Sequence, residues 1–231
     1  MPPDARRNLF RFGHVANDIN TLSRLLIISI KKYEDRIVAM FGDARAASIL
    51  RFLIGSTREG YLAVDRFILS SLFGREYLPR LTPEGEEALN RVKAHLGKMQ
   101  LITGLRNEFS FHVPDNPEID RAYGKLPIDV DVAVYSGAER HSSLYQMSHN
   151  LLICGMLELV PDSHAMTDND AMDAIISDLL SKSIALNDFI EQLIIVLVER
   201  HNLSPEPMRE VASIDTVESV STFAIPPLMR T

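Results

Sequence analysis

The chain has 231 residues but a single cysteine, no tryptophan, and an aromatic content of only 7%. One cysteine excludes an intrachain disulfide and a cysteine-based zinc site, and it is compatible with the cytoplasmic location that we expect. Because Cys154 lies in the apolar run 151–157, we interpret it as a small buried side chain. With so few aromatic residues, the core has to be built from aliphatic side chains, which suits a helical protein.

Long apolar runs and an excess of positive charge are also missing. The longest apolar runs, 25–30 and 193–198, are far shorter than the ~20 apolar residues that span a bilayer. The N-terminus lacks the apolar core of a signal peptide. We therefore expect a soluble protein with no membrane partner. The formal net charge of −7 argues against a non-specific DNA binder, but it leaves room for a small basic cleft that binds RNA.

Over most of the chain, apolar residues recur every three or four positions, which predicts helices with one buried face. Two of these helices have clear starts. Thr82 precedes Pro83, and Thr167 precedes Asp170 in a capping-box pattern. The predicted helical segments are 6–33, with an extension over 36–41 that Gly42-Asp43 ends, then 44–73, 83–112, 142–159 and 168–200.

The helical period disappears between 114 and 137. Residues 128–135 alternate at period two, which predicts a short strand whose partner is not evident. Beyond Leu203 the chain has four prolines and no steady period, which is typical of an extended or disordered tail. The prediction is an all-α bundle of about five helices over 1–202, with a small irregular or β insertion near 114–137 and a tail over 203–231.

One segment, Leu105 to His112, combines residues that suit phosphate chemistry. Val113-Pro114 follow it, and because the residue before a proline is pushed out of the α region, the segment should end a helix. Arginine binds phosphate oxygens through a planar fork of donors, and histidine titrates near neutral pH. Steps of three and four from Leu89 reach Arg106, so we expect Arg106 to face the apolar side, where a charge needs a partner or a function.

The order Leu105-Arg106-Asn107 and then Phe111-His112 resembles the Arg-Asn-x-x-x-x-His signature of the HEPN superfamily (higher eukaryotes and prokaryotes nucleotide-binding). The resemblance covers 105–112 in detail and 6–200 in outline. It implies a metal-independent endoribonuclease of the toxin or defence kind, without a cofactor, that acts on RNA as a homodimer and has an antitoxin protein as a partner. It also implies roles: Arg106 would hold the scissile phosphate, His112 would move a proton, and Asn107 would orient the histidine or the phosphate by hydrogen bonds.

Other interpretations stay open. Arg106 would pair with a carboxylate and His112 would cap the helix in a non-enzymatic HEPN-like module that dimerises and binds a nucleotide or a protein. An unrelated helical scaffold is a third interpretation. Arg106 and His112 differ by about 120° around a straight helix, so they share a site only if the helix end unwinds or a partner subunit supplies one of them. The other histidines, including His141 and His149, are interpreted as surface or partly buried polar residues.

Overall fold

The computed structural model of the protein describes residues 1–30, 34–110, 114–130, 133–136 and 143–203. Within these residues the fold is an all-α bundle with one small two-stranded sheet, which confirms the predicted fold class. The α-helices of this described part are α1 (Pro3–Ser29), α2 (Arg36–Val64), α3 (Leu72–Tyr77), α4 (Pro83–Leu96), α5 (Gln100–Leu105), α6 (Asn116–Tyr123), α7 (Gln146–Glu158) and α8 (Asp168–Arg200).

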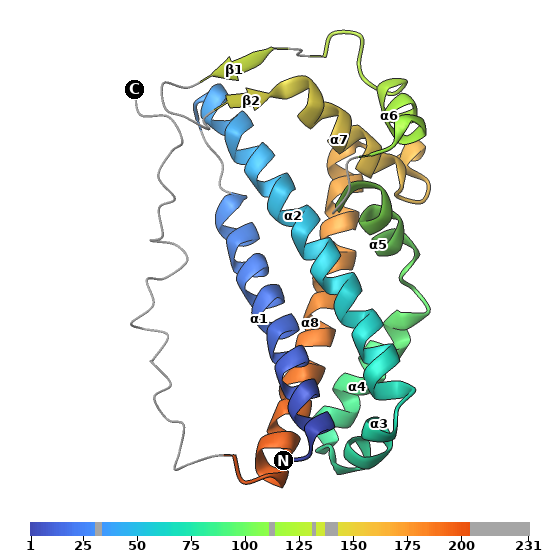
Figure 1. Cartoon of the computed structure of the whole chain (residues 1–231). Coiled ribbons are helices and arrows are strands. Elements are labelled where there is room, and N and C mark those ends of the chain that lie inside the picture. The colour runs from blue at the N-terminus through green and yellow to red at the C-terminus, as the bar shows by residue number, and fades with distance from the viewer. Residues whose placement is uncertain (31–33, 111–113, 131–132, 137–142, 204–231) are drawn as a thin grey trace.

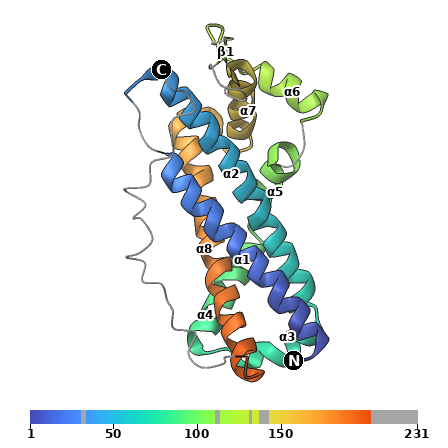
Figure 2. The same cartoon turned by 60° about the vertical axis from the view of Figure 1, so that its left-hand side comes forward.

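Three long helices, α1, α2 and α8, form the body of the bundle and lie side by side in both views (Figures 1 and 2). The shorter helix α4 packs against α8. The side chains between these helices are apolar and inaccessible to solvent, and each contributes roughly 1.5–3 kcal/mol by its burial. They include Phe12 from α1, Leu53 and Ile54 from α2, and Phe189 and Leu193 from α8.

The three long helices approach one another closely at Gly60 in α2. A Cβ atom at this position would lie 2.6 Å from Leu186 Cδ2 of α8 and 2.8 Å from Val15 Cγ1 of α1. Glycine costs about 1 kcal/mol relative to alanine inside a helix. Here that cost is offset, because the missing side chain lets α1 and α8 pack directly against the backbone of α2.

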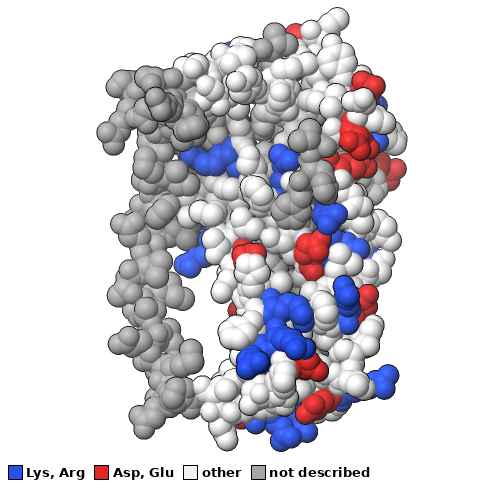
Figure 3. Space-filling view, in the orientation of Figure 1, with Lys and Arg blue, Asp and Glu red and all other residues white. Residues whose placement is uncertain are grey.

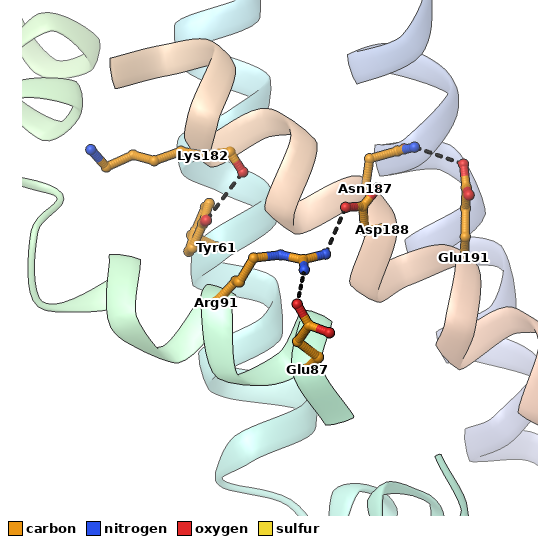
Figure 4. A network of polar contacts seen from close by, with 7 residues as sticks. All are labelled: Tyr61, Glu87, Arg91, Lys182, Asn187, Asp188 and Glu191. Atoms are coloured by element: carbon orange, nitrogen blue, oxygen red, sulfur yellow. Dashed lines mark hydrogen bonds and ion pairs between the residues drawn. The ribbon is translucent and has the colours of Figure 1, made fainter. Parts of the chain in front are cut away.

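Polar groups join α2, α4 and α8 within and beside this core (Figure 4). The Tyr61 hydroxyl donates a hydrogen bond to the Lys182 carbonyl over 3.1 Å. Burial raises the pKa of Tyr61 well above its usual value, so the hydroxyl keeps its proton and acts as the donor. At the more exposed edge, Arg91 of α4 pairs with Glu87 at 3.0 Å and with Asp188 of α8 at 2.8 Å.

The described chain has more helices than predicted, because two predicted helices are divided and the predicted insertion contains α6; a predicted break at Gly42 is absent. Gly42 does not end a helix but lies inside α2, which begins after Asp35, whose carboxylate accepts a hydrogen bond from the Val38 amide. The predicted helix 44–73 is divided by a π-helical turn, η1 (Asp65–Leu69), and the bend that follows it. The predicted helix 83–112 is interrupted at 97–99, between α4 and α5.

The predicted insertion contains a helix, α6, as well as β structure. Strand β1 (Val134–Ser136) pairs antiparallel with β2 (Ser143–Tyr145), and β2 is the partner that the sequence did not reveal. The predicted bounds of the strand were wrong, because 128–129 form a turn. Helix α6 packs against α7. The predicted tail lies outside the described residues from 204 onward.

Both predicted helix starts are confirmed. The Thr82 hydroxyl accepts a hydrogen bond from the Gly85 amide at the start of α4, over 3.1 Å. At the start of α8, Thr167 and Asp170 exchange the two side chain to backbone hydrogen bonds of a capping box. A search of the described helices found none with the length and hydropathy required to cross a membrane.

Candidate functional site

The predicted motif begins where α5 ends. Arg106 and Asn107 belong to a π-helical turn, η3 (Arg106–Ser110), which continues α5 directly. His112 lies outside the described residues, so its proposed role stays a prediction. The structure therefore brings two of the three predicted residues together on one turn, and single π turns inside helices are frequent at functional sites.

The Arg106 side chain is held on the surface of α2. Its Nη2 donates to Glu59 Oε1 over 2.7 Å, and its Nη1 donates to Asn107 Oδ1 over 3.2 Å. The side chain is 29% exposed, and that of Glu59 is 48% exposed, so the ion pair is open to solvent. The Nε atom of Arg106 is buried and has no hydrogen-bond partner among the described residues. The guanidinium is thus oriented by its neighbours and still reachable from outside.

The structure places Arg106 at the edge of the apolar side, half-buried. Ile102, Leu105, Phe109 and Ser110 are buried, and Arg106 follows Ile102 by four residues, the spacing of one helix face. Its side chain is 29% exposed, and its Nε atom is buried. The predicted stripe assumed one continuous helix from Leu89, whereas the helix is interrupted at 97–99.

A second arginine, Arg51 of α2, holds the end of this turn. Its Nε donates to the Phe109 carbonyl, and its Nη2 donates to the Ser110 carbonyl over 3.3 Å. The last carbonyls of a helix lack partners within the helix, so a cationic donor there satisfies them and suits the negative end of the dipole. Partial burial lowers the pKa of the Arg51 guanidinium. Nothing in the sequence links Arg51 to a segment 58 residues away, which is why it was missed.

The opposite side of the turn is tied to the insertion. Glu108 forms an ion pair with Arg121 of α6. Arg121 Nε also lies 3.5 Å from Glu158 of α7, and Lys125 Nζ lies 3.3 Å from the same carboxylate. The motif turn is therefore fixed from two directions, by α2 on one side and by α6 and α7 on the other.

Two hollows lie away from Arg106. Two adjoining cavities of about 610 and 890 Å³ share a wall formed by Asp43, His149, Ile153, Leu157 and Asp168. Burial lowers the pKa of His149, and the nearby Asp43 carboxylate opposes that shift. Cys154, predicted to be buried, is only partly so and lines the smaller cavity.

The described side chains do not form a metal site. No group of three or more His, Cys, Asp or Glu residues in the described ranges has the arrangement needed to hold a metal ion. Around the motif, the groups at hand are a guanidinium, an amide and a carboxylate. The guanidinium and the amide can bind an anion such as phosphate and stabilise negative charge that develops on it, and the carboxylate orients the guanidinium.

Comparisons with known proteins were made at three levels: families, single proteins and structures. No family model, no curated protein and no solved structure matches this chain.

Proposed function

We propose that the protein is a HEPN-like, metal-independent endoribonuclease that acts on RNA as a homodimer. The observation that carries the proposal is the Arg106 guanidinium, which is solvent-accessible and oriented by Asn107 and Glu59 at the end of a helix. An arginine held in this way is prepared to bind a phosphate, because little of its side-chain freedom remains to be lost on binding.

The chemistry follows from the proposed roles. The ribose 2′-oxygen attacks the phosphorus atom, and the bond to the 5′-oxygen of the next nucleotide breaks. Arg106 would stabilise the negative charge that grows on the phosphate oxygens. His112 would take the 2′-hydroxyl proton or supply the proton that the leaving 5′-oxygen requires. Asn107 would orient the arginine, to which its side chain is already hydrogen-bonded. The products would be a 2′,3′-cyclic phosphate and a free 5′-hydroxyl.

The decisive test is RNA cleavage by the purified protein in EDTA, with analysis of the product ends. Wild-type protein should leave cyclic phosphate or 3′-phosphate ends, and His112→Ala should lower the rate by roughly 10²–10⁴-fold. Arg106→Ala should lower the rate by about 10²-fold or more, the usual effect of losing one charge-stabilising donor. Arg91→Ala is the matched control, because Arg91 is also a half-exposed arginine in ion pairs. Wild-type protein that cleaves no RNA would contradict the proposal.

Dimerisation is a separate part of the proposal and has its own test. In the HEPN resemblance the two motifs meet across the subunit interface, and a toxin of this kind would be bound by an antitoxin protein. Sedimentation or small-angle scattering should therefore give the mass of two chains at tens of micromolar. A monomer at that concentration would exclude a site shared between subunits.

One observation favours a second function. The 2.7 Å contact between Arg106 and Glu59 neutralises the arginine, as expected in a non-enzymatic HEPN-like module that dimerises and binds a nucleotide or a protein. Glu59→Gln separates the two functions. In a ribonuclease, the variant frees Arg106 for phosphate, so RNA binding should be preserved or tightened. In a structural module, the same variant should only lower the melting temperature, and RNA should stay intact with either protein.

A further inference from the structure

Two arginines from different elements converge on one aromatic ring at the surface of α1 and α2. The guanidinium carbon of Arg11 in α1 lies 3.6 Å from the centroid of the Phe67 ring, and that of Arg66 in η1 lies 5.1 Å from the same centroid. Cation–π attraction holds each guanidinium near the ring. Figure 3 shows Lys and Arg side chains gathered on the lower half of this face. The gathering runs against the net charge of −7 of the whole chain.

These two charges are not neutralised by the described part of the protein. Neither Arg11 nor Arg66 forms an ion pair with a described carboxylate, and Arg11 donates instead to the neutral amide of Asn8. By contrast Arg7, one turn earlier on α1, pairs with Asp4 at 3.1 Å. Like charges held around one ring repel each other. A bound anion would remove that repulsion, so this surface is suited to an anionic ligand.

The Arg66 side chain lies on the same side of its helix as Glu59, which pairs with Arg106. Glu59 and Arg66 are seven residues apart, which is about two turns of α2 and its π-helical extension η1, or about 10 Å along the axis. The exposed side chain of Leu62 lies between them in the sequence and offers an apolar contact. A chain of phosphates that starts at Arg106 could therefore reach Arg66 and then Arg11 without leaving this face.

We propose that the Arg11–Arg66 surface, formed by Arg11, Arg66 and Phe67, binds the phosphate backbone of single-stranded RNA beside the Arg106 motif. The inference rests on the proposed ribonuclease function, because it identifies where the substrate strand would lie. Arginine suits this ligand: its fork of donors matches phosphate oxygens, and its planar face stacks on unpaired bases. Proteins that bind single strands without sequence preference combine positive charge with aromatic side chains, as this surface does.

The test measures binding separately from cleavage. The probe is a fluorescent 2′-O-methyl oligouridine, which lacks the attacking 2′-hydroxyl, and its binding is followed by anisotropy over a range of KCl concentrations. The double variant Arg11→Gln/Arg66→Gln should bind about tenfold more weakly at low salt. Its plot of log affinity against log salt should be shallower by about 1.4, the value for two lost phosphate contacts on a single strand.

A charge-matched control excludes a general effect of net charge. Lys93→Gln/Lys98→Gln also removes two positive charges, but at α4 and the turn after it, and it should bind like wild type. Equal weakening in both double variants would overturn the inference, as would unchanged binding in the arginine variant. Binding of phosphatidylserine vesicles without binding of the oligouridine would also overturn it. Circular dichroism of each variant verifies that the fold is retained.

The outcomes separate this inference from the ribonuclease proposal. If wild-type protein cleaves RNA in EDTA but oligouridine binding does not depend on Arg11 and Arg66, the proposed RNA-binding surface is contradicted and the ribonuclease proposal is not. If binding depends on these arginines but no RNA is cleaved, the surface is supported and the ribonuclease proposal is contradicted. In that case the chain would bind RNA without cutting it.

Discussion

The two ends of the molecule are held together by different forces. The bundle of α1, α2, α4 and α8 is stabilised mainly by apolar side chains that exclude solvent, such as Phe12, Leu53 and Phe189. The second region consists of the insertion together with β2 and α7. Exposed ion pairs add to its apolar contacts, and in them Arg121 and Lys125 contact the carboxylates of neighbouring segments. Exposed ion pairs are weakened by ionic screening, whereas apolar burial is not. The second region should therefore lose more stability than the bundle as the NaCl concentration rises.

The motif turn η3 lies at the boundary of these two regions. Arg51 and Glu59 attach it to the bundle, and Glu108 attaches it to the insertion through Arg121. Its geometry depends on both attachments. A site built in this way is held from both sides, which keeps the Arg106 side chain in place for a ligand.

The largest loss of stability should follow a substitution in the bundle core. Phe189→Ala removes a side chain with no solvent exposure and should lower the free energy of unfolding by about 3–5 kcal/mol. Leu152→Ala in α7 is the comparison, because Leu152 is only partly buried beside the core, and its loss should cost clearly less. Urea unfolding followed by circular dichroism measures both. Equal losses would mean that the two regions share one core of uniform packing.

A buried charge provides the next test. Lys182 in α8 is inaccessible to solvent, and its ammonium donates to Asp178, one turn away. Asp178→Ala leaves that cation without its partner and should cost about 3 kcal/mol, near the lower limit for a broken buried pair. Replacing both residues, with Asp178→Ala and Lys182→Met, should recover most of this loss in urea unfolding, because no charge is then buried. A double variant as unstable as the single one would show that packing and not charge is responsible.

The contacts that hold η3 should differ in how much they stabilise the protein and in how salt changes that contribution. Arg51→Ala leaves two carbonyls of a partly buried helix end without a donor and should cost about 1–3 kcal/mol. Arg121→Ala breaks half-exposed ion pairs and should cost at most about 1 kcal/mol, with the difference from wild type shrinking in 1 M NaCl. Melting temperatures at low and high salt measure both. A salt-sensitive Arg51 variant would contradict the contrast between the two sides.

The features that the sequence predicted are those with local causes. The caps at Thr82 and Thr167 involve residues only three positions apart, and the helical period needs no knowledge of the rest of the chain. The break after Leu96 was missed because Gly97 and Lys98 are tolerated inside helices, and their local chemistry does not demand a turn. That error joined α4 and α5 into one predicted helix.

The candidate site was only partly predictable for the same reason. Arg106 and Asn107 are adjacent in the sequence, so a motif could identify them. Glu59 and Arg51, which hold the turn, come from a helix about 50 residues earlier, and only the tertiary fold shows them. The convergence of Arg11 and Arg66 on Phe67 is likewise a product of the packing of α1 against α2.

The smallest expected effect is a loss of stability at acidic pH. One histidine in each region allows a comparison. Burial is the main cause that lowers the pKa of His95 in the bundle and of His149 beside the insertion. Because the pKa is lower in the folded state, the histidine of the unfolded chain binds a proton near pH 6.5, whereas the same histidine in the folded chain is protonated only at lower pH. Each histidine should therefore make the protein less stable as the pH falls below 6.5 toward the pKa of the folded state. His95→Gln and His149→Gln should each reduce the loss of stability between pH 7.5 and 5.5, as measured by urea unfolding.

The neighbours of the two histidines distinguish the regions. Lys182 lowers the pKa of His95 further, whereas the Asp43 carboxylate raises that of His149 and so opposes burial. Asp43→Asn should then lower the pKa of His149 and make the loss of stability on acidification steeper. The same substitution in the His149→Gln background should leave that slope unchanged between pH 7.5 and 5.5. If Asp43→Asn steepened the slope equally in both backgrounds, the effect would come from another group or from the proton of Asp43 itself, because burial raises the pKa of that carboxyl. His149 would then not be the residue through which acid destabilises this end of the molecule.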